Sequence, residues 1–178
     1  MASPIRILTA VPICDGHDSA INTINLEFIR HGIEVVYLGY HRSVGDIVRA
    51  AIQEDVRAIG ISSYNGGHVE FFADVVRQLK KEGADDIKVF GGGGGTITHV
   101  DAVAMERKGV EKIFFAGTSL NEMADYVQRA AEIAASLAGN EPVLKLLSDG
   151  LVAEFRTYKN PADTELWLDG LRKAGFEV

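Results

Sequence analysis

The stretch IRILTAVPICDGHD, at positions 5–18, joins an apolar run to a short polar turn and decides how this chain folds. Its first half has the composition of a strand buried on both faces, and open α/β folds bind ligands beyond the carboxyl ends of such strands. His17 lies in the turn, with Asp15 two residues before it. A neutral imidazole is a good metal ligand, and a neighbouring carboxylate fixes its tautomer. A helix-capping carboxylate beside a solvated loop histidine is the alternative.

The length and charge of the chain narrow its class. Its 178 residues suit one domain with a sizeable core and a small appendage. A net charge of −7 argues against nucleic acid or an anionic membrane as a partner. No apolar run approaches the ~20 residues that span a bilayer, and no signal peptide is recognisable, so we expect a cytoplasmic protein. The single cysteine, Cys14, excludes an internal disulfide, and a buried thiol is favoured over a catalytic pair with His17.

Strand and helix patterns alternate along the first 137 residues, separated by short turns. The expected strands cover residues 5–11, 34–38, 58–62, 87–90 and 112–115. The expected helices cover residues 21–30, 44–53, 69–81, 101–107 and, after a cap at Ser119, 120–137. In the first helix, Ile21, Ile24, Leu26 and Phe28 are expected mostly to face inward. Strands that are apolar throughout indicate a parallel sheet covered on both faces, and right-handed crossovers favour a doubly wound, five-stranded, Rossmann-like sheet in the order 2-1-3-4-5.

Residues 139–178 break this alternation. Gly139-Asn140-Glu141-Pro142 ends the fifth helix, and two further short helices are expected over residues 143–151 and 164–174. We therefore predict a short helical C-terminal extension or a linker to another part of a protein.

Polar and glycine-rich turns gather after the carboxyl ends of the expected strands. These turns hold His17, His41, Ser62-Ser63, His68, Gly91–Gly95, His99 and Gly117-Thr118. Loops are polar in most proteins, but the turns at the opposite edge of this sheet carry few such side chains. The pattern favours a ligand cleft at the carboxyl edge.

Several common ligands are excluded by the motifs at that edge. The chain has no P-loop, and its first βα turn lacks a dinucleotide-binding glycine pattern. Ser62 stands where a receiver domain would carry its phosphoacceptor carboxylate. The run Gly91–Gly95 removes side chains where a bulky planar group could lie, although a flexible loop is the alternative. A histidine ligand beside such a slot suits a metallocofactor with a long tail, whereas a zinc site from the four edge histidines lacks closely spaced ligand pairs.

Three motifs make the chain resemble a known family. They are Asp15-Gly16-His17-Asp18-Ser19-Ala20, Ser62-Ser63-Tyr64 and Gly91-Gly92, at the ends of the first, third and fourth strands. They resemble the D-x-H-x-x-G, S-x-L and G-G motifs of the cobalamin-binding domain of adenosylcobalamin-dependent acyl-CoA mutases. Ala20 replaces the motif glycine and Tyr64 the leucine. The resemblance runs from about Ile5 to Gln128.

One branch of that family looks most similar. The phrases QEDV at 53–56, SSYNGGHVE at 62–70 and FGGGGG at 90–95 resemble the N-terminal domain of the isobutyryl-CoA mutase that is fused to its GTPase chaperone. The resemblance implies a cobalamin-binding domain over residues 1–138. It does not cover residues 139–178.

The resemblance also implies roles for particular residues. His17 would replace the dimethylbenzimidazole of adenosylcobalamin as the lower axial ligand of cobalt, and Asp15 would hydrogen-bond its other ring nitrogen. The displaced nucleotide tail would lie beside the glycine run. The implied cofactor-binding residues are Asp15, Gly16, His17, Asp18, Ser62, Tyr64, Gly66, Gly91, Gly92, Gly93, Gly117 and Thr118, and no residue of this chain is expected to be catalytic by itself.

The implied function is that of a cofactor-carrying subunit or domain of a carbon-skeleton mutase, of the isobutyryl-CoA or methylmalonyl-CoA type. The chain has no room for an eight-stranded barrel of ~250 residues, so a TIM-barrel partner would bind the acyl-CoA, with a GTPase chaperone as a further partner. One alternative is a corrinoid carrier for methyl transfer, although such carriers usually have a helical bundle ahead of this domain. Another is a non-enzymatic cobalamin sensor or adaptor, with the extension as its effector.

Overall fold

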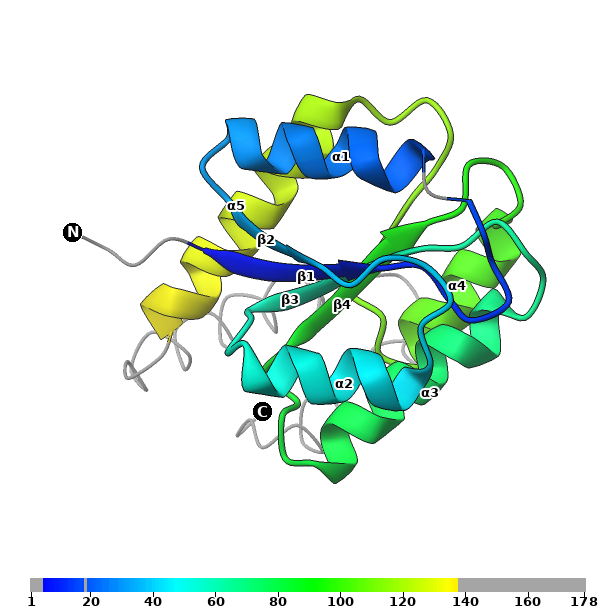
Figure 1. The fold of residues 1–178 in the computed structure, drawn as a ribbon, viewed down its shortest axis with the longest axis horizontal. Helices are drawn as coiled ribbons and strands as arrows, with labels where there is room; N and C mark the ends of the chain where they lie inside the picture. The colour runs from blue at the N-terminus through cyan, green and yellow to red at the C-terminus, as the bar shows by residue number, and fades with distance from the viewer. Residues whose placement is uncertain (1–4, 18, 138–178) are drawn as a thin grey trace, which may run out of the picture. The chain divides into compact units, whose positions relative to one another are not determined.

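The computed structural model describes residues 5–17 and 19–137, in which five strands and five helices alternate (Figure 1). The strands are β1 (Arg6–Ala10), β2 (Glu34–Tyr37), β3 (Ala58–Ser62), β4 (Lys88–Gly92) and β5 (Lys112–Phe114). The helices are α1 (Ser19–Arg30), α2 (Val44–Gln53), α3 (His68–Lys81), α4 (His99–Arg107) and α5 (Leu120–Leu137). These bounds confirm the predicted alternation, and the ends that differ from the predicted ones do so by only one or two residues.

The strands form one parallel sheet in the order β2-β1-β3-β4-β5, which confirms the predicted doubly wound topology. From β1 the chain crosses to β2 at one side, and from β3 it crosses to β4 at the other. The crossovers that follow β1 and β3 therefore run in opposite directions along the sheet, and open α/β sheets bind ligands at such a point.

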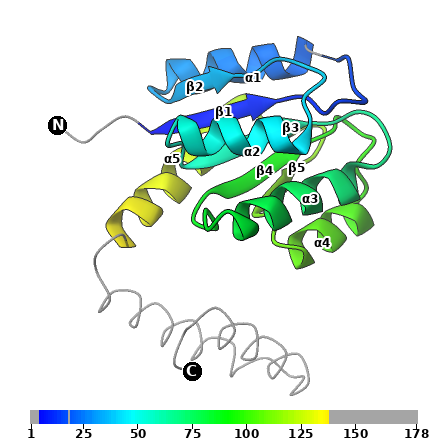
Figure 2. The same ribbon diagram turned by 60° about the horizontal axis from the view of Figure 1, so that its bottom comes forward.

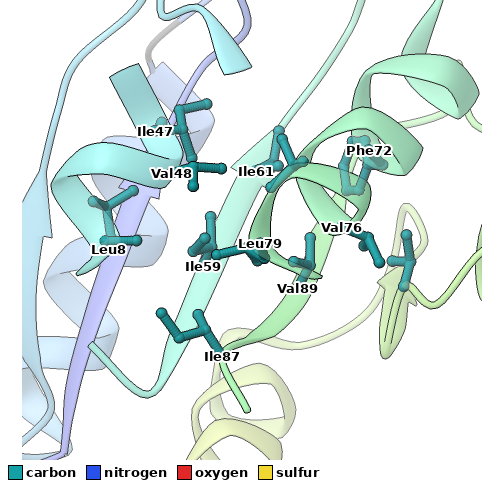
Figure 3. Close-up of a cluster of buried hydrophobic side chains, with 14 of the residues drawn as sticks. Leu8, Ile47, Val48, Ile59, Ile61, Phe72, Val76, Leu79, Ile87 and Val89 are labelled. Carbon is teal, nitrogen blue, oxygen red and sulfur yellow. The ribbon is translucent and has the colours of Figure 1, made fainter. Parts of the chain in front are cut away.

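Helices cover both faces of the sheet. The face under α2, α3 and α4 holds the larger buried cluster, and Figure 2 shows α3 between α2 and α4. Figure 3 shows Leu8 of β1, Ile59 of β3 and Val89 of β4 meeting side chains of α2 and α3. The other face, under α1 and α5, holds Ile7, Phe28, Ile33, Phe90, Phe114, Ala124 and Val127. Each large apolar side chain so buried contributes about 1.5–3 kcal/mol.

Side-chain caps begin α2, α4 and α5 at the carboxyl edge, whereas α3 begins at Gly67 without one. The Ser43 hydroxyl accepts a hydrogen bond from the backbone N–H of Asp46 at the start of α2, and Ser119, as predicted, accepts one from Glu122 at the start of α5. Thr98 and Asp101 form a reciprocal capping box on α4. These caps satisfy backbone donors that the first helical turns leave free.

Two predictions about burial are wrong. Leu26 is 59% exposed, because it lies about 200° around α1 from both Ile24 and Phe28 and so points away from the sheet. Cys14 is exposed because it lies in the turn beyond β1 and not in the strand.

The predicted extension, residues 139–178, lies outside the described residues, and the domain boundary at residue 138 stays a prediction. The sheet belongs to a compact unit that covers Met1–Ala131. In the described part of the chain, every helix is too short or too polar to span a bilayer.

Candidate functional site

The turn after β1 holds a paired carboxylate and imidazole. Asp15 is fully buried, and its Oδ1 accepts hydrogen bonds from the backbone N–H of His17 at 3.0 Å and from His17 Nδ1 at 3.2 Å. Since a carboxylate only accepts, the Nδ1 atom carries the proton, and in the neutral imidazole the free lone pair is on Nε2. The His17 side chain is 66% exposed. The pair thus presents an exposed imidazole at the carboxyl edge of the sheet.

The second oxygen of Asp15 joins this turn to the turn after β3. Its Oδ2 accepts hydrogen bonds from the backbone N–H groups of Tyr64 and Asn65. The Asn65 side-chain amide in turn donates to the Cys14 carbonyl. Burial by itself raises the pKa of the Asp15 carboxyl, but the donors from His17, Tyr64 and Asn65 outweigh it and hold that pKa below its usual value. Asp15 is therefore an anion at neutral pH.

A cavity of about 330 Å³ opens between the carboxyl halves of β1, β3, β4 and β5 and the first turns of α1 and α5. The rings of Phe90 and Phe114 form part of its wall and meet edge to face, with centroids 6.1 Å apart. Its volume lies at the lower end of the range for small-molecule sites, about 300–1,000 Å³.

The structure brings most of the predicted cofactor-binding residues to this cavity. Its lining includes Ser62, Tyr64, Gly91, Gly92, Gly93, Gly117 and Thr118. Asp15, Gly16 and His17 lie in the adjacent turn, and Tyr64 connects the two places because it lines the cavity and also contacts His17. Gly66 is exposed and is not part of the lining, and Asp18 lies outside the described residues.

Close packing requires glycine at two positions of β4, which the sequence alone did not reveal. A Cβ atom at Gly91 would collide with the Ile61 carbonyl and come within 2.7 Å of the Phe72 ring, on the face away from the cavity. A Cβ at Gly92 would lie 2.7 Å from the Phe114 carbonyl oxygen. Close approach of the protein's own strands and helices therefore requires these glycines, and their backbone forms the cavity wall as a consequence.

Two lining residues inside the strands were missed. Thr9 is fully buried, and its Oγ1 has no hydrogen-bond partner among the described residues. Gly60 lies beside it in the parallel register, and a Cβ there would meet the Phe90 ring at 3.0 Å. A threonine and a glycine within otherwise apolar strands are the sequence signal that could have identified them.

The other edge histidines are engaged separately. His41 Nδ1 lies 3.0 Å from the Ile13 carbonyl oxygen, His68 Nε2 lies 3.4 Å from Asp101 Oδ2, and the His99 ring lies 4.2 Å from the Phe115 ring. No three His, Cys, Asp or Glu side chains gather as a metal site within the described residues. The alternative of a zinc site from four histidines is therefore wrong.

Comparisons with known proteins agree with this geometry. The family model of the B12 binding domain matches residues 5–125. The chain is 44% identical over 113 residues to a fused isobutyryl-CoA mutase of Cupriavidus metallidurans, an alignment that covers 64% of this chain and 10% of that protein. It is 32% identical over 126 residues to the 2-hydroxyisobutanoyl-CoA mutase small subunit of Aquincola tertiaricarbonis, covering 71% of this chain and 91% of that subunit.

A solved structure is similar as well. It is a cobalamin-binding protein from Desulfitobacterium hafniense, with a TM-score of 0.60 and 26% identity over 71% of this chain and 58% of that one. The chain thus spans about a tenth of the length of the fused mutases it matches, and most of the length of the small subunit.

Proposed function

This chain belongs to the B12-binding domain family, and we propose that it binds adenosylcobalamin through His17 as the cofactor-carrying part of an acyl-CoA mutase. The observation that carries the proposal is the hydrogen-bonded pair of Asp15 and His17 beside a cavity at the carboxyl edge. Because Nδ1 is held by a buried carboxylate, Nε2 is the nitrogen available to cobalt.

The residues of the site fit this cofactor. The exposed imidazole supplies one ligand nitrogen, and the largely apolar cavity suits an aromatic base and its nucleotide tail. The buried Thr9 hydroxyl, which lacks a partner among the described residues, would gain one from a polar atom of that tail. When bound, adenosylcobalamin supplies the homolysis of its cobalt–carbon bond, which starts the rearrangement.

Each group of residues then has a separate task. His17 would bind cobalt in place of the cofactor's own base, and Asp15 would keep the imidazole in one tautomer. Ser62 and Thr118 would hold the displaced tail together with the backbone of Gly91, Gly92, Gly93 and Gly117. Asp18, Gly16 and Gly66 stay proposed contacts from the motif alone.

The wider function is part of the same proposal. The names of the relatives support a mutase of the isobutyryl-CoA or methylmalonyl-CoA type, whose acyl-CoA would be bound by a TIM-barrel subunit or domain. A GTPase chaperone and a cytoplasmic location are also proposed. The match to a separate small subunit supports residues 1–138 as a carrier domain, with residues 139–178 as an extension.

Electron paramagnetic resonance tests the ligand directly. The unpaired electron of cob(II)alamin couples to its axial nitrogen, so labelling the histidines with nitrogen-15 should change the superhyperfine pattern of the complex. The His17→Ala variant should lose this response and keep the cofactor's own base on cobalt. His31→Ala, which removes an imidazole that follows α1 and contacts Glu27, is the matched control and should behave like the wild type. If the superhyperfine pattern of the wild-type complex is the same with and without nitrogen-15 histidine, the proposal is contradicted.

Activity tests the role in a mutase. The chain, adenosylcobalamin and a TIM-barrel mutase subunit should together convert isobutyryl-CoA to butyryl-CoA, and the chain alone should not. Failure with every acyl-CoA mutase barrel tried would favour the sensor or adaptor alternative.

A further inference from the structure

The rings of Tyr64 and His17 are stacked, with centroids 5.2 Å apart and planes inclined by 27°. We propose that Tyr64 is a positioning residue that sets the tilt of the His17 imidazole. This inference rests on the proposed function, in which His17 binds cobalt.

The His17 ring needs such a support. Its side chain is 66% exposed, and Asp15 holds it only at the Nδ1 edge. A ring held at one edge can still tilt about the axis of that hydrogen bond. A second ring against its face restricts the tilt and so fixes the direction in which the Nε2 lone pair points.

Tyr64 is itself held from two sides. Its backbone N–H donates to Asp15 Oδ2, the carboxylate that also binds His17. Its ring lies over the turn after β4, where a Cβ atom at Gly94 would come within 2.6 Å of Tyr64 Cε1. Gly94 also has φ +58°, so both its backbone conformation and this ring favour glycine at the position.

The residue type matters at this position. The family motif that the sequence resembles has leucine where this chain has Tyr64, and leucine offers bulk but no aromatic face. Tyr64 also lines the cavity, so the same ring contacts both the imidazole and the proposed tail site. Tail binding and the geometry of the axial ligand would therefore be coupled through one side chain.

The first test compares Tyr64→Leu with Tyr64→Phe in the full chain. Without cofactor, proton NMR should show a shift of the His17 Cε1 proton caused by the ring current of the stacked aromatic ring in the wild type and in Tyr64→Phe. This shift should be lost in Tyr64→Leu. With cob(II)alamin, leucine should change the nitrogen coupling of His17 and weaken binding by about two- to tenfold, the factor expected from one stacked aromatic pair. Tyr64→Phe should keep the wild-type nitrogen coupling and the wild-type affinity.

A second variant guards against simple misfolding. Gly94→Ala should displace the Tyr64 ring and reproduce the leucine phenotype, but it should have a smaller effect in the Tyr64→Leu background, where no ring is displaced. Circular dichroism of each variant reports whether the sheet is intact.

The outcomes separate the two proposals. Unchanged NMR shift, nitrogen coupling and affinity in Tyr64→Leu would overturn the positioning role alone. A wild-type chain that shows the ring-current shift but no histidine nitrogen on cobalt would overturn the proposed function, and with it the role of Tyr64 in ligation.

Discussion

The two faces of the sheet are filled differently, and the difference separates what holds the fold from what can bind a ligand. On the face under α2, α3 and α4, the register places Ile59 beside Val89, and large side chains fill the layer between the sheet and the helices. On the face under α1 and α5, the same strands place Thr9 beside Gly60. Gly92 lies on the next strand, two residues nearer the carboxyl end. Small residues in the carboxyl halves of adjacent strands thus create the cavity, although the backbone is equally regular on both faces.

The largest expected effect comes from removing a large side chain from the core under α2, α3 and α4. Phe72→Ala should lower the free energy of unfolding by about 3–5 kcal/mol, because the ring is fully buried and its loss leaves a hole in a packed core. Ile24→Ala, at a half-buried position that already borders the cavity, should cost much less. Urea unfolding followed by circular dichroism measures both. Equal losses would mean that the two faces contribute alike.

The next effect is at the rim of the cavity. Asp15→Asn keeps the shape of the side chain but removes the charge that accepts hydrogen bonds from His17, Tyr64 and Asn65. Cobalamin affinity should fall by about 10- to 100-fold, the usual loss when the partner of a metal-bound histidine is removed. Titration with cob(II)alamin measures this loss. An affinity within twofold of the wild type would show that Asp15 serves folding alone.

Asp15 should also make stability depend on pH in the chain without cofactor. Its folded-state pKa is lowered, so the unfolded state binds the proton more tightly and the stabilisation is present above the unfolded value of about 3.9. It is lost as pH falls through the lower folded pKa. The stability gap between wild type and Asp15→Asn should therefore be constant near neutral pH and narrow below about pH 4. A gap that widens in acid would contradict the assignment.

The smallest expected effect comes from filling the cavity. Ala20 lies on α1 at the cavity wall, and Ala20→Leu should weaken cobalamin binding by about tenfold while the chain still folds, because the added atoms occupy existing space. Asn22→Leu, on the exposed side of the same helix, is the matched control. Binding that is unaffected by Ala20→Leu would place the tail outside this cavity.

Local features of the site could be predicted from the sequence. Asp15 and His17 are two residues apart, so their hydrogen bond forms within one turn and needs little from the rest of the fold. The partners of the second Asp15 oxygen, Tyr64 and Asn65, lie about fifty residues away and could not be paired with it by spacing. The exposure of Leu26, by contrast, follows from the helical period, which places it opposite Ile24 and Phe28, so the sequence contained the signal.

By itself, the sequence determined the alternation of strands and helices, the parallel sheet, and the imidazole with its carboxylate at the carboxyl edge. Those features follow from periodicity and from neighbours along the chain, which act before any long-range contact forms. Only the tertiary structure decided that Thr9 and Gly60 face a cavity and that Tyr64 lies against His17. It also decided that carbonyl groups of adjacent strands leave no room for side chains at the glycines of β4. These depend on strand register and on the close approach of segments far apart in the chain, and one residue of slip would turn each side chain to the other face.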